Sequence, residues 1–181
     1  FSSAVKLYYA GVLPVEYPVE RRGDFECDVE LHNRILEVGD ATLRLCMHEH
    51  YEDTPWREQA LYAMDARVQA LCGYSVFGEY DFPRESIRLL GSNVRDDGLL
   101  ALNAPGVAPI TIPSFSLVWI LMVKDYYDYS GRTDMIEEFG GRIKSLLDIF
   151  LSKLGDNGLS VIEKKPSLWY FYEWSPGLNG V

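Results

Sequence analysis

The 181-residue sequence lacks the features that mark membrane-inserted and secreted chains. Its longest apolar stretch, residues 115–123, is interrupted by Ser116 and ends at Lys124, so it is too short to span a bilayer. The chain opens at Phe1 without the charged and apolar regions of a signal peptide. We therefore expect no membrane-spanning segment.

Basic residues are also scarce. Lys and Arg total 17 against 27 Asp and Glu, which gives a formal net charge of −10. Nucleic acids and anionic membranes are bound through Lys and Arg that displace counterions from phosphate groups. We therefore expect neither nucleic acid nor a membrane among the partners. Aromatic residues reach 13%, which suits either helix packing or a surface that stacks on sugar rings.

Cysteine and histidine are too few and too scattered to suggest a disulfide or metal site. Cys27, Cys46 and Cys72 are odd in number and widely spaced, each in or beside an apolar helical pattern. We interpret them as reduced core residues, which favours a cytoplasmic location. The three histidines show no ligand spacing, so we predict no metal and no cofactor.

The first part of the chain is expected to be extended. Pro14 and Pro18 interrupt an apolar segment there, and proline is confined to edge strands and irregular segments. We predict that residues 1–24 form a linker or an edge strand leaving a preceding β domain, and that residues 25–181 form the main domain.

Apolar residues then recur at helical spacing. Asp28 is expected to cap the first helix and Thr54 the second, with Pro55 in the first turn of the second. Gly131 marks the end of the fourth. The predicted helices span residues 29–47, 55–74, 83–94, 114–129 and 134–154.

Five helices in sequence make the chain mainly α. Residues 98–113 are expected to form a long irregular loop, because prolines at 105, 109 and 113 exclude regular structure. Residues 159–162 are a short strand candidate. The helix pattern leaves two architectures open: a closed bundle, or part of a ring of helical hairpins.

One short segment carries the residues with evident chemistry. On the predicted helix, Glu58 and Asp65 are two turns apart on one face, with Tyr62 between them and Asp53 near the N-terminus. Carboxylates bind sugar hydroxyls, aromatic rings stack on sugars, and a carboxylic acid with a raised pKa can protonate a glycosidic oxygen. The spacing alone leaves open a plainer interpretation, an amphipathic helix on which Arg57 pairs with Asp53.

The same segment resembles the signature of bacterial α-L-rhamnosidases: Asp-Cys-Pro-x-Arg, then Glu, then Gly-Trp-x-Gly-Asp. The matching positions are Asp53, Pro55, Arg57, Glu58 and Asp65. Further stretches resemble the same domain in the same order, at residues 15–18, 23–25, 31–35, 43–47, 112–116, 125–131 and 172–174. The resemblance implies the N-terminal part of an (α/α)6 six-hairpin barrel with a short extended segment before it.

Several positions depart from the family pattern. Thr54 stands where the family usually has Cys, Tyr62 where it has Trp, and Glu173 where Asp commonly precedes Trp174. Tyr62 can still stack on a sugar, so the departures bear on substrate choice more than on fold.

The resemblance implies an inverting glycoside hydrolase that releases terminal α-L-rhamnose from a rhamnosylated glycoside or oligosaccharide. Glu58 would be the catalytic residue, acting as general acid, and Tyr62 and Trp174 would be stacking walls. The implied substrate-binding residues are Asp53, Arg57, Tyr62, Asp65 and Trp174.

An inverting enzyme also needs a carboxylate base about 6.5 to 9.5 Å from the acid. Two helical turns would separate the Cα atoms of Glu58 and Asp65 by about 10.5 Å on one wall, which makes Asp65 a poor candidate. In the family the base is a Glu near the end of the barrel, beyond this sequence. We therefore expect an inactive fragment, with the apolar faces of its last two helices exposed and prone to self-association.

Other interpretations remain open at this point. The chain can be a non-catalytic carbohydrate-binding or scaffold helical domain, or a helical-barrel glycosidase with another sugar preference. The aromatic residues 169–172 suit a binding wall and a half-barrel core equally, whereas the loop-like context of Trp174 favours ligand contact.

Overall fold

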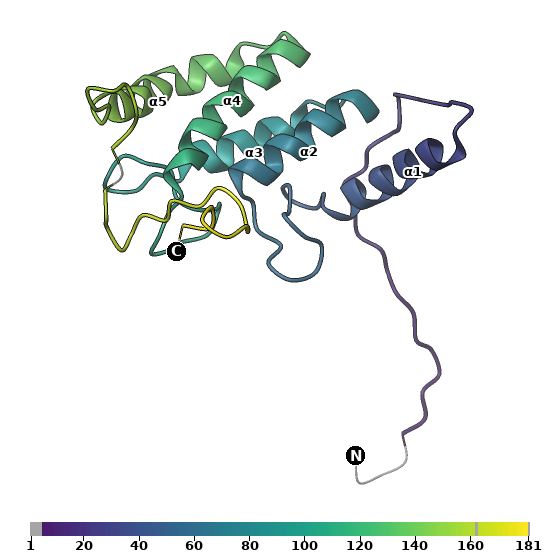
Figure 1. Ribbon diagram of the computed structural model, residues 1–181. Helices are drawn as coiled ribbons and strands as arrows, with labels where there is room; N and C mark the ends of the chain where they lie inside the picture. Colours follow the sequence, from purple (N-terminus) through teal and green to yellow (C-terminus); the bar gives the residue numbers. More distant parts are fainter. Residues whose placement is uncertain (1–4, 162, 181) are drawn as a thin grey trace.

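The computed structural model describes residues 5–161 and 163–180, and these are mainly α-helical (Figure 1). The helices are α1 (Glu30–Leu45), α2 (Ala63–Val76), α3 (Asp81–Ser92), α4 (Pro113–Ser130) and α5 (Asp134–Leu151). The predicted order of helices and the fold class are confirmed. No helix in the described ranges combines the length and hydropathy that a membrane span requires. The strand candidate is reduced to a single bridge between Leu154 and Ser160, and Ile162 lies outside the described residues.

Local sequence determines the ends of α4. Pro113 occupies the first turn, where its missing N–H group has no intrahelical partner to lose. Gly131 follows the helix with a left-handed φ of 70°, and its N–H donates to the Tyr127 carbonyl at 2.8 Å. The end at Gly131 agrees with the prediction, whereas Pro113, which was predicted to belong to the preceding loop, is the first residue of the helix.

The predicted cap of α1 is wrong. Val29 is the N-cap, and no side chain caps the helix there. Instead, the Asn33 side chain reaches back to Cys27, accepting a hydrogen bond from its N–H at 3.0 Å and donating one to its carbonyl at 2.9 Å. The side-chain amide of Asn33, a residue of α1, thus closes the turn before the helix. Asp28 does not cap the helix.

The helix predicted over residues 55–74, with Thr54 as its cap, is wrong in its first part, because α2 begins only at Ala63 and Tyr62 is its N-cap. Gln59 has a φ of 51°, in the left-handed region that a right-handed helix excludes. The carbonyl of Leu61 accepts a hydrogen bond from the Ala104 N–H at 3.2 Å, as part of an isolated β-bridge. Pairing with a distant loop therefore replaces the local helical hydrogen bonds.

Helices α2 and α4 make the most extensive interhelical contact, and α3 and α5 pack against α4 as well. Trp119 of α4 is fully buried, and its indole N–H donates to the Ile87 carbonyl of α3 at 2.9 Å. Its ring meets Phe139 of α5 edge-on, at 5.3 Å between ring centroids. A single tryptophan thus joins three helices.

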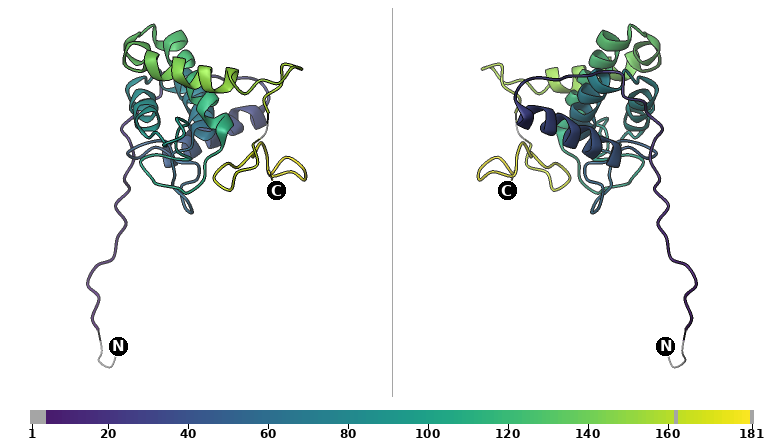
Figure 2. Two further views of the ribbon diagram at one scale, coloured as in Figure 1. Left: turned by 90° about the vertical axis from the view of Figure 1, so that its left-hand side faces the viewer. Right: turned by 90° about the vertical axis from the view of Figure 1, so that its right-hand side faces the viewer.

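Helix α1 lies at one side of the molecule and among the helices contacts only α2 (Figures 1 and 2). Before it, the Tyr17 N–H donates to the Met47 carbonyl at 2.9 Å and the Gly23 N–H to the Val76 carbonyl at 2.8 Å. These bonds fasten the incoming chain to the helical body, whereas residues 5–15 are extended and exposed (Figure 1). The domain boundary after residue 24 stays a prediction.

All three cysteines are free, but they do not share one environment. Cys46 is buried, as expected of a core residue, whereas Cys27 is half-buried and Cys72 is exposed. Cys72 lines an open groove between α1 and α2, since these helices contact each other only weakly. The core prediction therefore holds for Cys46 and is wrong for Cys72.

Substitution of Gly91 tests the packing around Trp119. A Cβ atom on Gly91 would lie 2.4 Å from Cζ2 of Trp119 and 2.9 Å from Cε1 of Phe139. We expect Gly91→Ala to lower the free energy of unfolding by about 1–3 kcal/mol, measured by urea denaturation, because two buried rings must shift.

Gly141 on α5 is the matched control, since a Cβ atom there meets nothing within 4 Å. Gly141→Ala should raise the free energy of unfolding by about 0.5–1 kcal/mol through helix propensity. Equal effects of the two substitutions would contradict the packing described around Gly91.

Candidate functional site

A cavity of about 400 Å³ lies where α2 and α4 begin, a volume in the range of small-molecule sites. Tyr62 is the N-cap of α2 and Asp65 lies in its first turn, while Ile112 and Phe115 hold the corresponding places on α4. Two helix starts thus frame one cavity. The lining residues are Asp53, Thr54, Arg57, Glu58, Tyr62, Asp65, Leu102, Ile112, Phe115, Trp169, Phe171 and Trp174.

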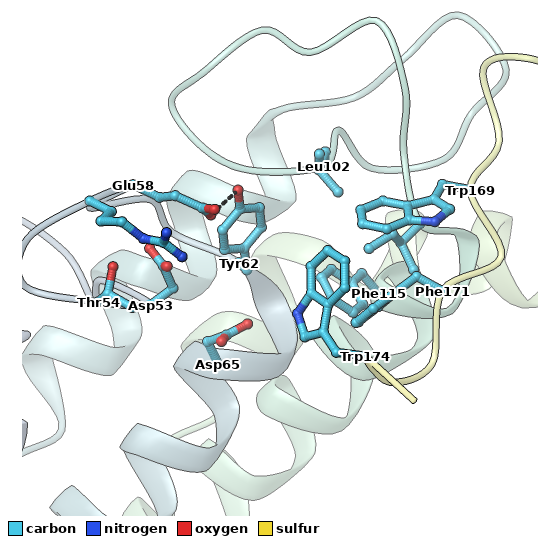
Figure 3. A pocket seen from close by; sticks show the side chains of 12 residues that line it. Asp53, Thr54, Glu58, Tyr62, Asp65, Leu102, Phe115, Trp169, Phe171 and Trp174 are labelled. Atoms are coloured by element: carbon cyan, nitrogen blue, oxygen red, sulfur yellow. Dashed lines mark hydrogen bonds between the residues drawn. The ribbon is translucent and has the colours of Figure 1, made fainter. Parts of the chain in front are cut away.

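Every site residue predicted from the sequence lines this cavity. These residues are Asp53, Arg57, Glu58, Tyr62, Asp65 and Trp174. The residues labelled in Figure 3 lie on two facing walls: a polar wall from residues 53–65, and an aromatic wall that includes Trp169, Phe171 and Trp174. The structure therefore brings the predicted set together, and the role of each residue remains a prediction.

The polar wall is built on a closed loop and not on a helix. Asp53 and Ala60 exchange two hydrogen bonds: the Asp53 N–H donates to the Ala60 carbonyl at 3.0 Å, and the Ala60 N–H donates to Asp53 Oδ1 at 2.9 Å. Glu58 lies on the turn between them. The helical rise used to separate Glu58 from Asp65 therefore does not apply, because only Asp65 belongs to α2.

The side chain of Glu58 has a defined partner within this wall. The Tyr62 hydroxyl donates a hydrogen bond to Glu58 Oε2 at 2.9 Å (Figure 3). Arg57 and Glu58 are both exposed at the cavity mouth. Among the residues that the structure describes, no ion pair joins Arg57 to Asp53, so the plainer interpretation of a surface pair on a helix is not supported.

The aromatic wall is a cluster of three rings. The ring centroids of Phe171 lie 4.8 Å from those of both Trp169 and Trp174, and the two tryptophans are 5.7 Å apart. The backbone N–H of Trp169 donates to the Thr111 carbonyl at 2.8 Å, and Thr111 is fully buried. Trp174 remains 75% exposed, so one ring of the wall is open to a ligand.

Sequence reasoning did not assign the apolar residues between the two walls. Leu102, Ile112 and Phe115 line the cavity, and Phe115 also meets the ring of Tyr62 at a centroid distance of 6.5 Å. Ile112 and Phe115 belong to the family-like stretch at residues 112–116. Leu102 and Ile112 lie in the long loop predicted over residues 98–113, and such loops often border sites. Its β-bridge to Leu61 makes this loop part of the site.

Burial governs the electrostatics of the polar wall. It raises the pKa of the Asp65 carboxyl, and the nearby charges of Asp53 and Glu58 raise it further, against the effect of a backbone hydrogen bond. Burial also raises the pKa of the Tyr62 hydroxyl, followed by the hydrogen bond and charge of Glu58. Tyr62 therefore remains a hydrogen-bond donor at neutral pH. Within the described ranges, no group of three or more His, Cys, Asp or Glu side chains is placed to hold a metal ion.

The raised pKa of Asp65 gives a testable pH dependence of stability. Because the folded chain holds this proton in a pH window where the unfolded chain has lost it, the free energy of unfolding falls as pH rises through that window. We expect Asp65→Asn to stabilise the fold at pH 7, as measured by urea denaturation. The gain should vanish below the ordinary Asp pKa of 3.8, where both states are protonated.

The exposed Asp156 provides the control for this measurement, since Asp156→Asn removes the same charge from a surface turn. This control should show no such gain at pH 7. A loss of stability in Asp65→Asn at pH 7 would contradict the burial of an unfavourable charge in the cavity.

Comparison with known proteins agrees with this architecture. Residues 20–176 match the family described as bacterial alpha-L-rhamnosidase 6 hairpin glycosidase domain. An alpha-L-rhamnosidase of Formosa agariphila is 25% identical over 165 residues, which cover 78% of this chain and 16% of that protein.

Two solved structures show the same arrangement of helices. A GH78 family rhamnosidase of Bacillus sp. GL1 superposes with a TM-score of 0.74 at 27% identity, over 83% of this chain and 16% of that one. A rhamnosidase from Klebsiella oxytoca with rhamnose bound has a TM-score of 0.73 at 23% identity, over 84% of this chain and 30% of that one. The chain spans about a sixth of the Formosa protein and belongs to the bacterial α-L-rhamnosidase six-hairpin glycosidase domain family, of which it represents a part.

Proposed function

We propose that the chain forms the acid-bearing, sugar-binding side of the active site of an inverting α-L-rhamnosidase. The substrate would be a terminal α-L-rhamnosyl group of a glycoside or oligosaccharide. One observation supports this most strongly: a single cavity is lined by three carboxyl groups, an Arg and a wall of aromatic rings. Carboxylates that bind hydroxyl groups and rings that stack on C–H faces are the groups that a sugar requires.

The chemistry assigns different roles to the three carboxyl groups. Glu58 lies at the exposed mouth of the cavity, where a leaving group can reach it, and is proposed as the general acid. Asp53 has one carboxyl oxygen bonded to the Ala60 N–H, and Asp65 lies deeper, at the start of α2. These two are proposed, with Arg57, to hold the sugar hydroxyl groups.

The base is proposed to come from outside these 181 residues. All carboxyl groups that line the cavity belong to residues 53–65, and the facing wall contributes aromatic and apolar side chains. An inverting mechanism needs a second carboxylate on the opposite face of the sugar ring, with room for a water molecule. The chain spans only 16% of its Formosa and Bacillus relatives, so the proposal concerns the longer polypeptide that contains it.

Substitution of the proposed acid tests this function directly. In the longest polypeptide that contains the chain, Glu58→Gln should reduce kcat for an alkyl α-L-rhamnoside by about 10²–10⁴-fold, because it removes the proton donor. Release of the alcohol from the rhamnoside is the measurement. Far-UV circular dichroism should be unchanged, since Glu58 lies on an exposed turn.

Two further variants serve as controls. Glu49→Gln removes the same charge from an exposed position outside the cavity and should keep wild-type turnover. Asp65→Ala should instead raise KM and lower kcat together, because hydrogen bonds to sugar hydroxyls tighten toward the transition state. Wild-type turnover in Glu58→Gln would refute the acid assignment. A wild-type polypeptide that binds rhamnose without hydrolysing rhamnosides would favour a non-catalytic binding domain.

The 181-residue chain by itself is expected to be inactive on rhamnosides and to self-associate. Two helices carry large apolar side chains that are exposed to solvent. On α1, Leu31 is 65% and Ile35 59% exposed, and on α5, Leu151 is 63% exposed. Helix α4 buries most of its apolar residues in the core, so the prediction that its apolar face is exposed is wrong. The exposed apolar surface lies on α1, which the sequence did not predict, and on α5. Exposed patches of this kind favour association, because burying them is favourable by about 25 cal/mol per Å².

Sedimentation velocity over a range of concentrations measures this association, with rhamnoside turnover assayed on the same samples. Ile35→Lys combined with Leu31→Lys should shift the distribution toward monomer, since both positions are exposed. A stable, active monomer of the unmodified chain would contradict both expectations.

A further inference from the structure

The proposed acid lies on a part of the backbone that gives its side chain little support. Glu58 is exposed and belongs to the turn over residues 55–58, outside any helix. The next residue, Gln59, turns the chain with a left-handed φ of 51°. A Glu side chain in such a place samples many rotamers, and ordering it costs conformational entropy. Proton donation in a fixed direction therefore requires a second group that orients this carboxyl.

Tyr62 is held rigidly by comparison. It is the N-cap of α2, and its carbonyl accepts the hydrogen bond from the Ala66 N–H at 3.0 Å. Its ring is half-buried and lies edge-on to Phe115, at 6.5 Å between centroids and an interplanar angle of 68°. Phe115 is itself buried in the first turn of α4. The hydroxyl group of Tyr62 is thus fixed by the same two helices that frame the cavity.

The hydrogen bond between the two residues has the direction that positioning requires. The Tyr62 hydroxyl donates to Glu58 Oε2 at 2.9 Å, which leaves Oε1 to carry the proton for the leaving group (Figure 3). Because the pKa of Tyr62 is raised by burial and by Glu58, the phenol keeps its own proton at neutral pH. It can therefore orient the carboxyl group without competing as a base.

We infer that Tyr62 is the positioning residue for Glu58, and that its hydroxyl group fixes the carboxyl so that Oε1 faces the glycosidic oxygen. This role rests on the proposed function of Glu58 and adds to it. It differs from the stacking role expected from the sequence, because stacking needs only the ring, whereas orientation of Glu58 needs the hydroxyl group.

Stacking by Tyr62 and positioning of Glu58 by Tyr62 predict different dependences of kcat on the leaving group. An alkyl alcohol leaves only when its oxygen is protonated, whereas 2,4-dinitrophenolate leaves without an acid. In the longest polypeptide that contains the chain, Tyr62→Phe keeps the ring and removes the hydroxyl. We expect its kcat for a methyl α-L-rhamnoside to fall about tenfold further than its kcat for the 2,4-dinitrophenyl α-L-rhamnoside. A tenfold difference is expected because about that factor in rate corresponds to the loss of one hydrogen bond. The KM values should change little.

Two variants are measured in parallel. Tyr127→Phe removes a hydroxyl from a half-exposed tyrosine of α4 outside the cavity and should leave both rates unchanged. Glu58→Gln should show a larger difference between the two substrates than Tyr62→Phe. A Tyr62→Phe variant that loses the same factor on both substrates, while Glu58→Gln discriminates between them, would overturn the positioning role and leave the proposed function standing. If Glu58→Gln itself does not discriminate, the acid assignment fails, and the role of Tyr62 fails with it.

Discussion

The site depends on the packing of α2 against α4. Both helices begin at the cavity, and the contact between Tyr62 and Phe115 joins their first turns. Helix α2 buries mainly small residues, which allow neighbouring helices to approach closely; they are Ala63, Ala66, Ala70 and Gly73. Since the two helices are the most extensively packed pair in the described structure, the separation of the cavity walls follows from the core. Tyr62, Asp65 and Phe115 are thereby held in place by this pair of packed helices.

The cavity combines two opposing electrostatic effects at one helix start. The first turn of a helix favours a negative charge, because its N–H groups point outward and the helix dipole is positive there. Burial acts against the ionised form of Asp65 at the same place, together with the charges of Asp53 and Glu58. A cluster of carboxyl groups in a half-enclosed cavity is unfavourable for stability alone, and under the proposed function the hydroxyl groups of a bound sugar would satisfy these carboxylates.

Sequence patterns that act within a few residues predicted some of the helix ends and site residues, and could not predict those that depend on contacts with distant parts of the chain. The C-terminal end of α4 was predictable because Gly131 acts within one turn of the chain. The start of α2 was not, because it depends on the bridge from Leu61 to Ala104 in a distant loop. The residues of the polar wall were found through the family motif, although the helix assumed for them was wrong. The aromatic wall was left undecided, since the backbone pairing that positions Trp169 involves Thr111, far away in the sequence.

The parallel bridge between Thr111 and Leu168 also bears on how the protein is made. Ribosomes release the chain from its N-terminus, at roughly 5–20 residues per second, and helices that are close in sequence form early. The polar wall therefore leaves the ribosome well before the aromatic segment that faces it. During synthesis the half-built cavity exposes its carboxyl groups and Phe115 to water, and the cavity is not complete until Trp174 has emerged and its segment has docked on Thr111.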